Sequence, residues 1–69
     1  MFLNEVDNFA DVLKQAQKDH KRVSILVAGS YKPFTGFVKS VNIFQTQLEN
    51  EYSVEYIRNV EIKAVRIYE

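Results

Sequence analysis

The spacing of apolar residues changes once along the chain, close to Arg22. Before that point, apolar residues recur at intervals of three and four positions, which places them on one face of a helix. Acidic residues gather near the start of this segment and basic residues near its end, as the helix dipole favours. The pattern predicts one amphipathic helix over residues about 4–20, with an apolar face made of Val6, Phe9, Ala10, Leu13 and Ala16.

After Arg22 the apolar pattern takes a period of two, which is typical of β-strands. Gly29 and Pro33 interrupt it and mark a turn after the first strand. Gly36 lies inside the second predicted strand, where a glycine indicates a sharp bend or a bulge. Five short strands are predicted in all, over residues 23–28, 34–41, 44–48, 52–56 and 61–68.

Asparagine residues mark two of the later turns. Asn42 ends the second predicted strand, and Asn59 follows the fourth, where we expect it to take a left-handed backbone conformation. One helix followed by five closely spaced strands predicts a mainly β fold, with a five-stranded, strongly bent antiparallel small barrel over about 22–68. No repeat, linker or low-complexity segment appears, so residues 1–69 are assigned to a single domain.

Length and composition limit the chemistry of the chain. A chain of 69 residues buries a small core, and small domains usually gain stability from disulfides, a metal or self-association. The sequence has no cysteine and one histidine, His20, which we assign to the end of the helix. Disulfides and thiolate zinc sites are therefore excluded. No carboxylate pair, metal cluster or phosphate-binding loop is visible, so we expect no enzyme activity, no cofactor and no metal.

Targeting signals are not evident in the sequence. The first residues lack the basic start and long apolar run of a secretion signal. No apolar stretch approaches the roughly 20 residues that span a bilayer. The lack of cysteine fits a reducing compartment. We therefore expect a cytoplasmic protein with no membrane partner.

Charge and edge strands bear on the partners of the domain. Nine basic and nine acidic residues give a net charge of zero, which argues against a general, salt-driven grip on nucleic acid. The last two predicted strands are apolar on both faces, which suits an exposed sheet edge poorly. Such edges could pair between copies, head to tail, and close a ring. The alternative is that the helix covers the edge within one monomer, and the pattern alone leaves both open.

Two segments resemble the two sequence motifs of the Sm, Lsm and Hfq proteins. The first covers residues 23–48, with alternating apolar residues, Gly29, and then Gly36 opening a bent strand. The second covers residues 56–62, where Tyr-Ile-Arg-Asn-Val-Glu-Ile is similar to the family's Ile-Arg-Gly and following strand. The helix before the first strand also fits the family. The resemblance spans essentially the whole chain and implies a barrel of the Sm-like (SH3-like) type.

Several positions depart from the family pattern and make the chain an atypical relative. Gly29 and Gly36 are more widely spaced than usual, which lengthens the first hairpin. Asn42 replaces the usual aspartate, and Asn59 replaces the usual glycine. Thr46 stands where many Lsm proteins have an asparagine that contacts a base. The Lys-His pair of typical bacterial Hfq is missing, which puts ordinary Hfq function in doubt.

The resemblance implies a function and a set of site residues. Sm-like proteins form rings of roughly five to seven subunits through their fourth and fifth strands. By resemblance, Phe44 would stack on a base of single-stranded, U- or A-rich RNA, and Arg58 would cover the other face of that base. Asn42 and Thr46 would hydrogen-bond to a base edge or to the turn itself, beside Asn59. An RNA chaperone or scaffold is the implied role.

Each of these residues also has an interpretation that needs no RNA. Phe44 is equally well explained as a core aromatic on a strand, and Arg58 as the partner of Glu55 or Glu61 in an ion pair across the turn. The asparagines are ordinary turn residues. A rival function follows, in which the domain is an oligomeric module that recognises protein and has no RNA affinity. The zero net charge favours that rival.

A second contact surface is suggested on the long first hairpin. Tyr31, Lys32 and Phe34 form an aromatic and basic cluster in this segment, which we expect to be exposed. The alternative is a packed hairpin tip with a purely structural role.

Overall fold

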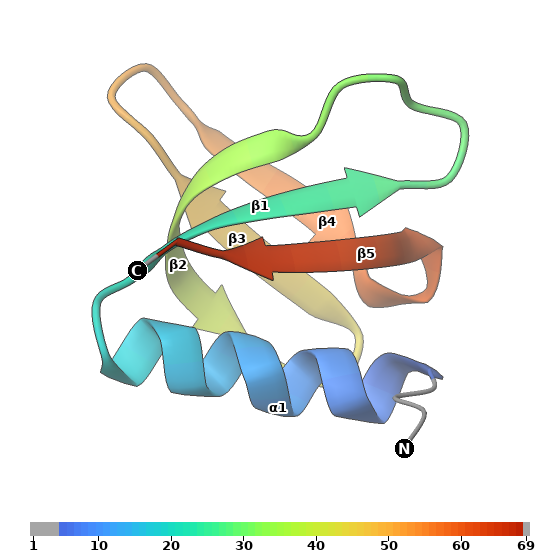
Figure 1. The fold of residues 1–69 in the computed structure, drawn as a ribbon, viewed down its shortest axis with the longest axis horizontal. Helices are drawn as coiled ribbons and strands as arrows, with labels where there is room; N and C mark the ends of the chain where they lie inside the picture. Colours follow the sequence, from blue (N-terminus) through green and yellow to red (C-terminus); the bar gives the residue numbers. More distant parts are fainter. Residues whose placement is uncertain (1–4, 69) are drawn as a thin grey trace.

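The helix and the five strands predicted from the sequence are all present in the computed structural model (Figure 1). The structure describes residues 5–68, with side chains from Phe9 onward. Residues 1–4 and 69 of the predicted domain lie outside the described residues, as does the side chain of Val6. The elements are α1 (Glu5–Lys18), β1 (Arg22–Val27), β2 (Phe34–Val41), β3 (Gln45–Glu49), β4 (Val54–Arg58), the 3-10 helix η1 (Asn59–Glu61) and β5 (Ile62–Ile67).

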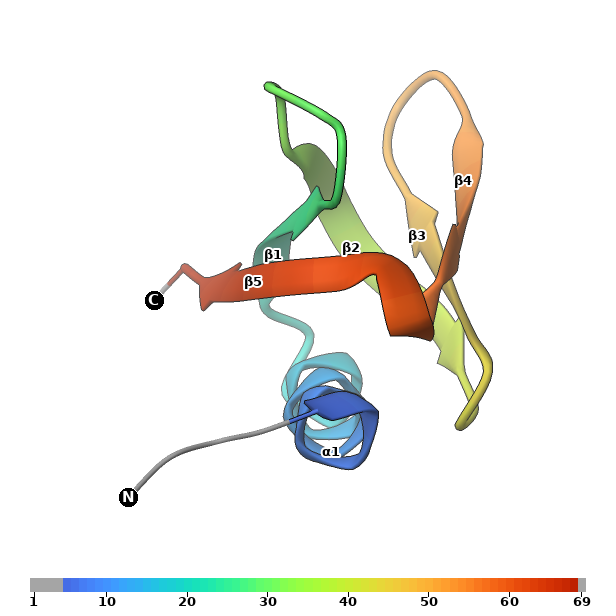
Figure 2. The ribbon, with the colours of Figure 1, turned by 90° about the vertical axis from the view of Figure 1, so that its right-hand side faces the viewer.

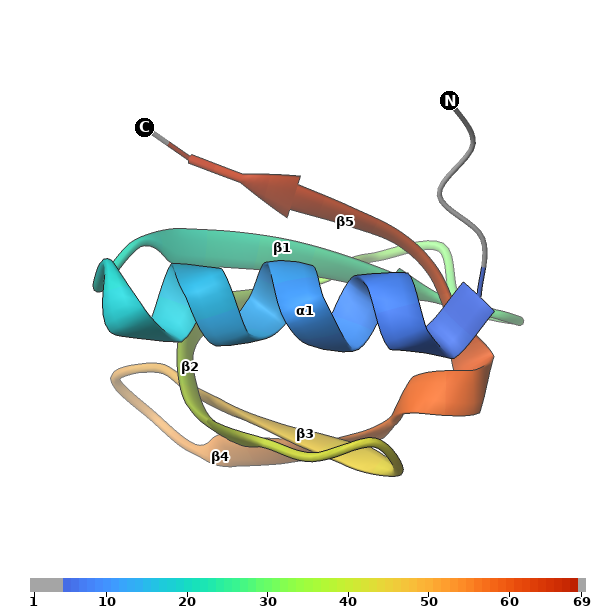
Figure 3. The ribbon, with the colours of Figure 1, turned by 90° about the horizontal axis from the view of Figure 1, so that it is seen from below.

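The five strands form one antiparallel sheet in the order β4-β3-β2-β1-β5. Figures 2 and 3 show β2 curving from the half that contains β1 and β5 to the half that contains β3 and β4. The sheet is therefore strongly bent, as predicted. β4 and β5 each pair with one neighbour only, so they are the two edges of the sheet.

Gly36 permits the bend in β2. A Cβ atom at this position would collide with the backbone carbonyl oxygen of Glu49 on β3. Only glycine allows the two backbones to approach this closely. A register shift between Val38 and Ser40 adds a local irregularity two residues further along. The predicted bend or bulge in the second strand is confirmed.

His20 ends the helix and turns the chain toward β1. Its φ angle of 55° is left-handed, and its N–H donates to the carbonyl oxygen of Gln17 over 3.2 Å. The N–H of Lys21 donates to the carbonyl oxygen of Ala16 over 3.0 Å. This pair of bonds is the Schellman motif, which satisfies the last free carbonyls of a helix. The assignment of His20 to the helix end is confirmed.

The core lies between α1 and the concave inner face of the sheet. In Figure 3, α1 has β1 and β5 on one side and β3 and β4 on the other. The side-chain amide of Gln17 donates to the carbonyl oxygen of Lys39 over 2.7 Å, at the irregular part of β2. Burial of each large aliphatic side chain contributes about 1.5–3 kcal/mol. The buried cluster consists of Leu13, Ala16, Val23, Ile25, Val38, Leu48, Ile57 and Ile62.

None of the helices within residues 5–68 has the length and apolar character needed to cross a membrane.

Candidate functional site

The turn between β2 and β3 is closed by the side chain of Asn42. Its Oδ1 atom accepts hydrogen bonds from the backbone N–H groups of Phe44, at 2.7 Å, and Gln45, at 2.8 Å. The N–H of Asn42 donates to the carbonyl oxygen of Gln45 over 2.9 Å. This arrangement is an Asx turn, which asparagine forms readily. Hydrogen bonding to the turn itself was one of the two roles predicted for Asn42, and its side chain makes these bonds.

Phe44 projects from this turn into solvent. It lies just before β3, and 72% of its surface is exposed. The interpretation of Phe44 as a core aromatic on a strand is therefore wrong. Its backbone carbonyl accepts from the N–H of Asn59 over 2.9 Å, so the backbone behind the ring is anchored. An exposed aromatic ring on a fixed turn is available for stacking.

A buried polar network lies behind the turn. The hydroxyl of Thr46 donates to Oδ1 of Asn59 over 2.7 Å, and Nδ2 of Asn59 donates to the carbonyl oxygen of Asn42 over 2.6 Å. Thr46 is 0% exposed and Asn59 is 1% exposed. Buried polar groups are costly unless they are hydrogen-bonded, and these two satisfy each other. The network joins the β2–β3 turn, β3 and η1 into one unit.

The backbone predicted for Asn59 is wrong. Among the described non-glycine residues, His20 alone has a positive φ, whereas Asn59 opens the 3-10 helix η1. A helical turn reverses the chain here, and the asparagine side chain points inward to join Asn42 and Thr46. Thr46 and Asn59 therefore lie beneath the surface, where they can position the turn. Of the five predicted RNA-binding residues, Asn42, Phe44 and Arg58 are the exposed ones.

Arg58 lies at the same end of the sheet as Phe44. It is the last residue of β4 and is paired in register with Gln45, the residue that follows Phe44. Its side chain is exposed, and within residues 5–68 it forms no ion pair with Glu55 or Glu61. The alternative role of Arg58 in such a pair is not supported.

Two apolar residues beside Phe44 were missed by the sequence analysis. Ile43, in the β2–β3 turn, and Val60, in η1, are both more than half exposed. The buried network joins the two segments that carry them. Large contiguous apolar patches mark contact surfaces, whereas single exposed apolar residues are normal on a protein surface. The sequence signal was the apolar pair that follows Asn42, within a turn where polar residues are the rule.

The predicted second surface is only partly formed. Tyr31 is fully exposed and Lys32 is exposed, but Phe34 is half-buried and packs against the core. The expectation that Phe34 is exposed is wrong, because the first residue of β2 already points to the inner face. Tyr31 instead borders a hollow of about 280 Å³ beside Leu26 and Arg66.

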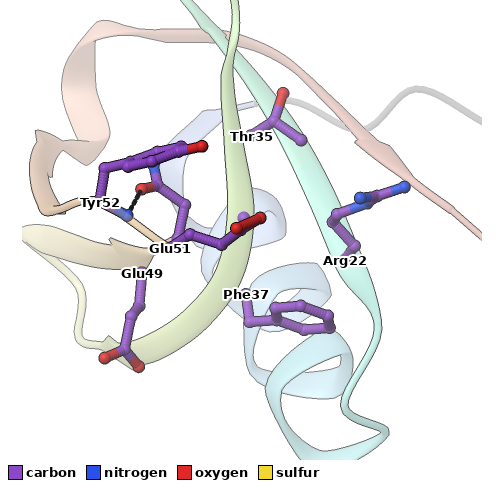
Figure 4. Close-up of a pocket in the computed structure, with 8 residues that line it drawn as sticks. Arg22, Thr35, Phe37, Glu49, Glu51 and Tyr52 are labelled. Atoms are coloured by element: carbon purple, nitrogen blue, oxygen red, sulfur yellow. Dashed lines mark hydrogen bonds between the residues drawn. The ribbon is translucent and has the colours of Figure 1, made fainter.

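A larger open hollow of about 530 Å³ lies between the start of β1, β2 and the β3–β4 turn (Figure 4). Figure 4 shows Tyr52 on the side opposite Arg22, with Phe37 on the same side as Arg22. Asn50 closes the β3–β4 turn as Asn42 closes the other, since its Oδ1 accepts from the N–H groups of Tyr52, at 2.8 Å, and Ser53, at 3.0 Å. This turn holds Tyr52 outside β4, although the sequence placed it in the strand.

Two arginines share one aromatic ring at the end of β5. The guanidinium carbon of Arg22 lies 5.4 Å from the centroid of the Tyr68 ring, and that of Arg66 lies 5.3 Å from it. Both distances fall within the range of cation–π attraction. Elsewhere, residues 5–68 contain no group of three acidic or histidine side chains placed to hold a metal ion.

The fold has a counterpart among solved structures, although the sequence matches no family model and no curated protein sequence. The chain is similar to Hfq, described as a pleiotropic translational regulator, at 14% sequence identity and a TM-score of 0.77. The match covers 99% of this chain and 100% of the other. The predicted Sm-like fold is confirmed, and at this identity the likeness concerns the fold alone.

Proposed function

We propose that this chain is a subunit of a homo-oligomeric ring that binds single-stranded, U- or A-rich RNA. The binding surface is the β2–β3 turn with Phe44, bordered by Arg58. The ring holds RNA as a chaperone or scaffold in the cytoplasm, without catalysis and without a cofactor. The observation that carries the proposal is the exposed Phe44 ring on a fixed turn next to Arg58, on a domain with the fold of Hfq.

The energetics of this surface suit weak contacts that are repeated. Stacking of a base on an aromatic ring contributes about 1–3 kcal/mol, largely independent of base identity. Arg58 adds one positive charge per subunit, so the affinity for RNA should fall only modestly as the salt concentration rises. Repetition around a ring would raise the effective concentration of each site. A chain with zero net charge can therefore still bind RNA.

The Asn42 turn and the buried Thr46–Asn59 pair preorganise the surface. Because these hydrogen bonds already hold the backbone of Phe44, little conformational entropy is lost when a base stacks on the ring. Thr46 and Asn59 thus act as positioning residues. Asn42 contributes through its turn, and Phe44 and Arg58 make the direct contacts.

Self-association is supported by the two unpaired edges of the sheet. β4 and β5 carry free backbone donors and acceptors on their outer sides, which is unfavourable for a lone domain. α1 packs across the concave face, chiefly against β2, and forms no backbone pairing with either edge. Pairing of β4 of one copy with β5 of the next satisfies both edges at once and closes a ring of roughly five to seven subunits.

A second candidate function is an oligomeric protein-interaction module without RNA affinity. The exposed Ile43 and Val60 beside Phe44 favour it, because an apolar patch suits a protein partner. The two functions differ in salt dependence, since phosphate contacts weaken as salt rises and apolar contacts do not.

The test is a fluorescence anisotropy titration of labelled oligo-uridine and oligo-adenosine at two salt concentrations. Phe44→Ala and Arg58→Ala should each weaken binding by about tenfold, while the oligomeric mass is unchanged. Tyr31→Ala and Lys39→Ala are matched controls, since both residues are exposed outside the proposed surface. Saturable wild-type binding that neither test variant weakens contradicts this site. No binding to either RNA at low salt supports the protein-interaction module.

A further inference from the structure

The two open edges of the sheet differ in charge. The hairpin that leads into β4 carries Glu49, Glu51 and Glu55, and the sequence has no basic residue between Lys39 and Arg58. We call these three glutamates the acidic hairpin. The strand β4 therefore has an acidic N-terminal end and, at Arg58, a basic C-terminal end.

The β5 edge has the opposite character at its C-terminal end. Arg66 and Arg22 both lie against the ring of Tyr68, and within residues 5–68 neither guanidinium forms an ion pair. We call these two arginines the basic edge. At the N-terminal end of β5, Glu61 and Lys63 cancel each other. Within residues 5–68, two positive charges thus lie against one ring without a counter-charge, at one end of an unpaired strand.

These charges distinguish between the possible ways of joining two copies. Antiparallel pairing of β4 with the next copy's β5 brings the acidic hairpin beside the basic edge. Parallel pairing of the same strands would bring Arg58 beside the basic edge instead. Pairing of two β5 strands brings no acidic hairpin to the basic edge, and pairing of two β4 strands leaves both basic edges unpaired. Like charges at an interface are strongly disfavoured, which argues against the parallel arrangement, and the first arrangement is the one that pairs the acidic hairpin with the basic edge.

We propose that the acidic hairpin of one copy docks on the basic edge of the next, and that this contact sets the direction and the partner of assembly. The inference rests on the proposed ring and adds the contact that determines which edges pair and in which direction. The hollow beside the acidic hairpin, which Arg22 of the same copy also lines, offers the aromatic rings of Phe37 and Tyr52 and the carboxylate of Glu51 to an incoming guanidinium. Assembly should therefore weaken as salt is raised.

The experiment is a charge swap on the full chain, read by sedimentation velocity across a range of concentrations. One variant reverses the acidic hairpin (Glu51→Lys with Glu55→Lys), and the other reverses the basic edge (Arg22→Glu with Arg66→Glu). Matched controls reverse exposed charges on α1 and in the turn that follows it: Asp11→Lys with Asp19→Lys, and Lys14→Glu with Lys18→Glu. Circular dichroism confirms that every variant is folded.

Each reversed variant alone should need about tenfold more protein than wild type to assemble, whereas an equimolar mixture of the two should assemble at a lower protein concentration than either variant alone. The α1 controls should not change assembly. Unchanged assembly of both reversed variants, or a mixture of folded variants that assembles no better than either variant alone, overturns the inference while leaving the ring intact. Loss of assembly only on reversal of the acidic hairpin also overturns it, in favour of pairing between β4 strands. A wild-type chain that stays monomeric at all concentrations overturns the proposed ring and this inference together.

Discussion

The buried pair of Thr46 and Asn59 gives the sharpest test of how the candidate site is held. Replacement of Thr46 by Val keeps the shape of the side chain but removes the hydroxyl that donates to Oδ1 of Asn59 over 2.7 Å. Because both residues are fully buried, water cannot replace the lost donor. Leaving one buried acceptor unpaired costs about 1–3 kcal/mol. We expect the free energy of unfolding to fall by that amount.

A companion variant separates the hydrogen bond from packing. Thr46→Ser keeps the hydroxyl and loses one methyl group, which costs about 0.8 kcal/mol of apolar burial. Thr46→Ser should therefore destabilise less than Thr46→Val. Thr35→Val is the matched control, since Thr35 is an exposed threonine on β2, and its effect should stay within about 0.5 kcal/mol.

The assay is urea denaturation followed by circular dichroism, with all variants at one protomer concentration because assembly shifts apparent stability. A loss of 1 kcal/mol corresponds to a fall in Tm of about 4–8 °C for a domain of this size. If Thr46→Val is as stable as wild type, or if Thr46→Ser is the less stable of the two, the network does not stabilise the site as argued.

Three further substitutions test other parts of the fold. Gly36→Ala should destabilise by about 1–3 kcal/mol, because the new Cβ meets the Glu49 carbonyl oxygen; a neutral effect in urea denaturation would show that β2 and β3 can separate freely. Asn42→Ala should cost about 1 kcal/mol and weaken RNA binding. Asn50→Ala, at the other Asx turn, should cost a similar amount and weaken RNA binding less, because that turn does not hold Phe44. Equal RNA affinities of the two variants would contradict the role of the Asn42 turn. His20→Gly should raise thermal stability by up to about 1 kcal/mol, since glycine adopts a φ of 55° without strain; a lower Tm would refute this.

The periodic parts of the sequence were sufficient to predict the fold. The second strand, Phe34–Val41, was predicted with its observed bounds, and Gly36 correctly indicated the bend. The alternation of apolar and polar residues predicts the strands correctly here because the inner face of the sheet is buried. Each position along a strand therefore faces either the core or the solvent. The alternation did not predict where a strand begins when an asparagine side chain closes the preceding turn by hydrogen-bonding to the backbone. Phe44 and Tyr52 continue the apolar pattern of β3 and β4, yet each sits outside its strand because an asparagine two residues earlier closes a turn.

The candidate site was predictable in location and not in its internal organisation. The resemblance indicated Asn42, Phe44 and Arg58, and the structure places all three on exposed segments at one end of the sheet. The burial of Thr46 and Asn59 depends on a contact between positions 13 residues apart, which no local pattern reports. One feature of the sequence did indicate this burial. Thr46 and Leu48 are two positions apart in β3 and therefore lie on the same face of the strand, which predicts that the Thr46 hydroxyl faces inward.

The central claim is that single-stranded RNA stacks on Phe44. Photo-crosslinking of the wild-type protein to a 4-thiouridine-labelled U-rich oligonucleotide, followed by mass spectrometry of the crosslinked peptides, tests it most directly. The account predicts that the crosslink maps to the segment around Phe44 and is lost in Phe44→Ala, while Tyr31→Ala retains it. A crosslink confined to the hairpin of Tyr31 or to that of Tyr52, or no crosslink under conditions of saturable binding, would contradict it.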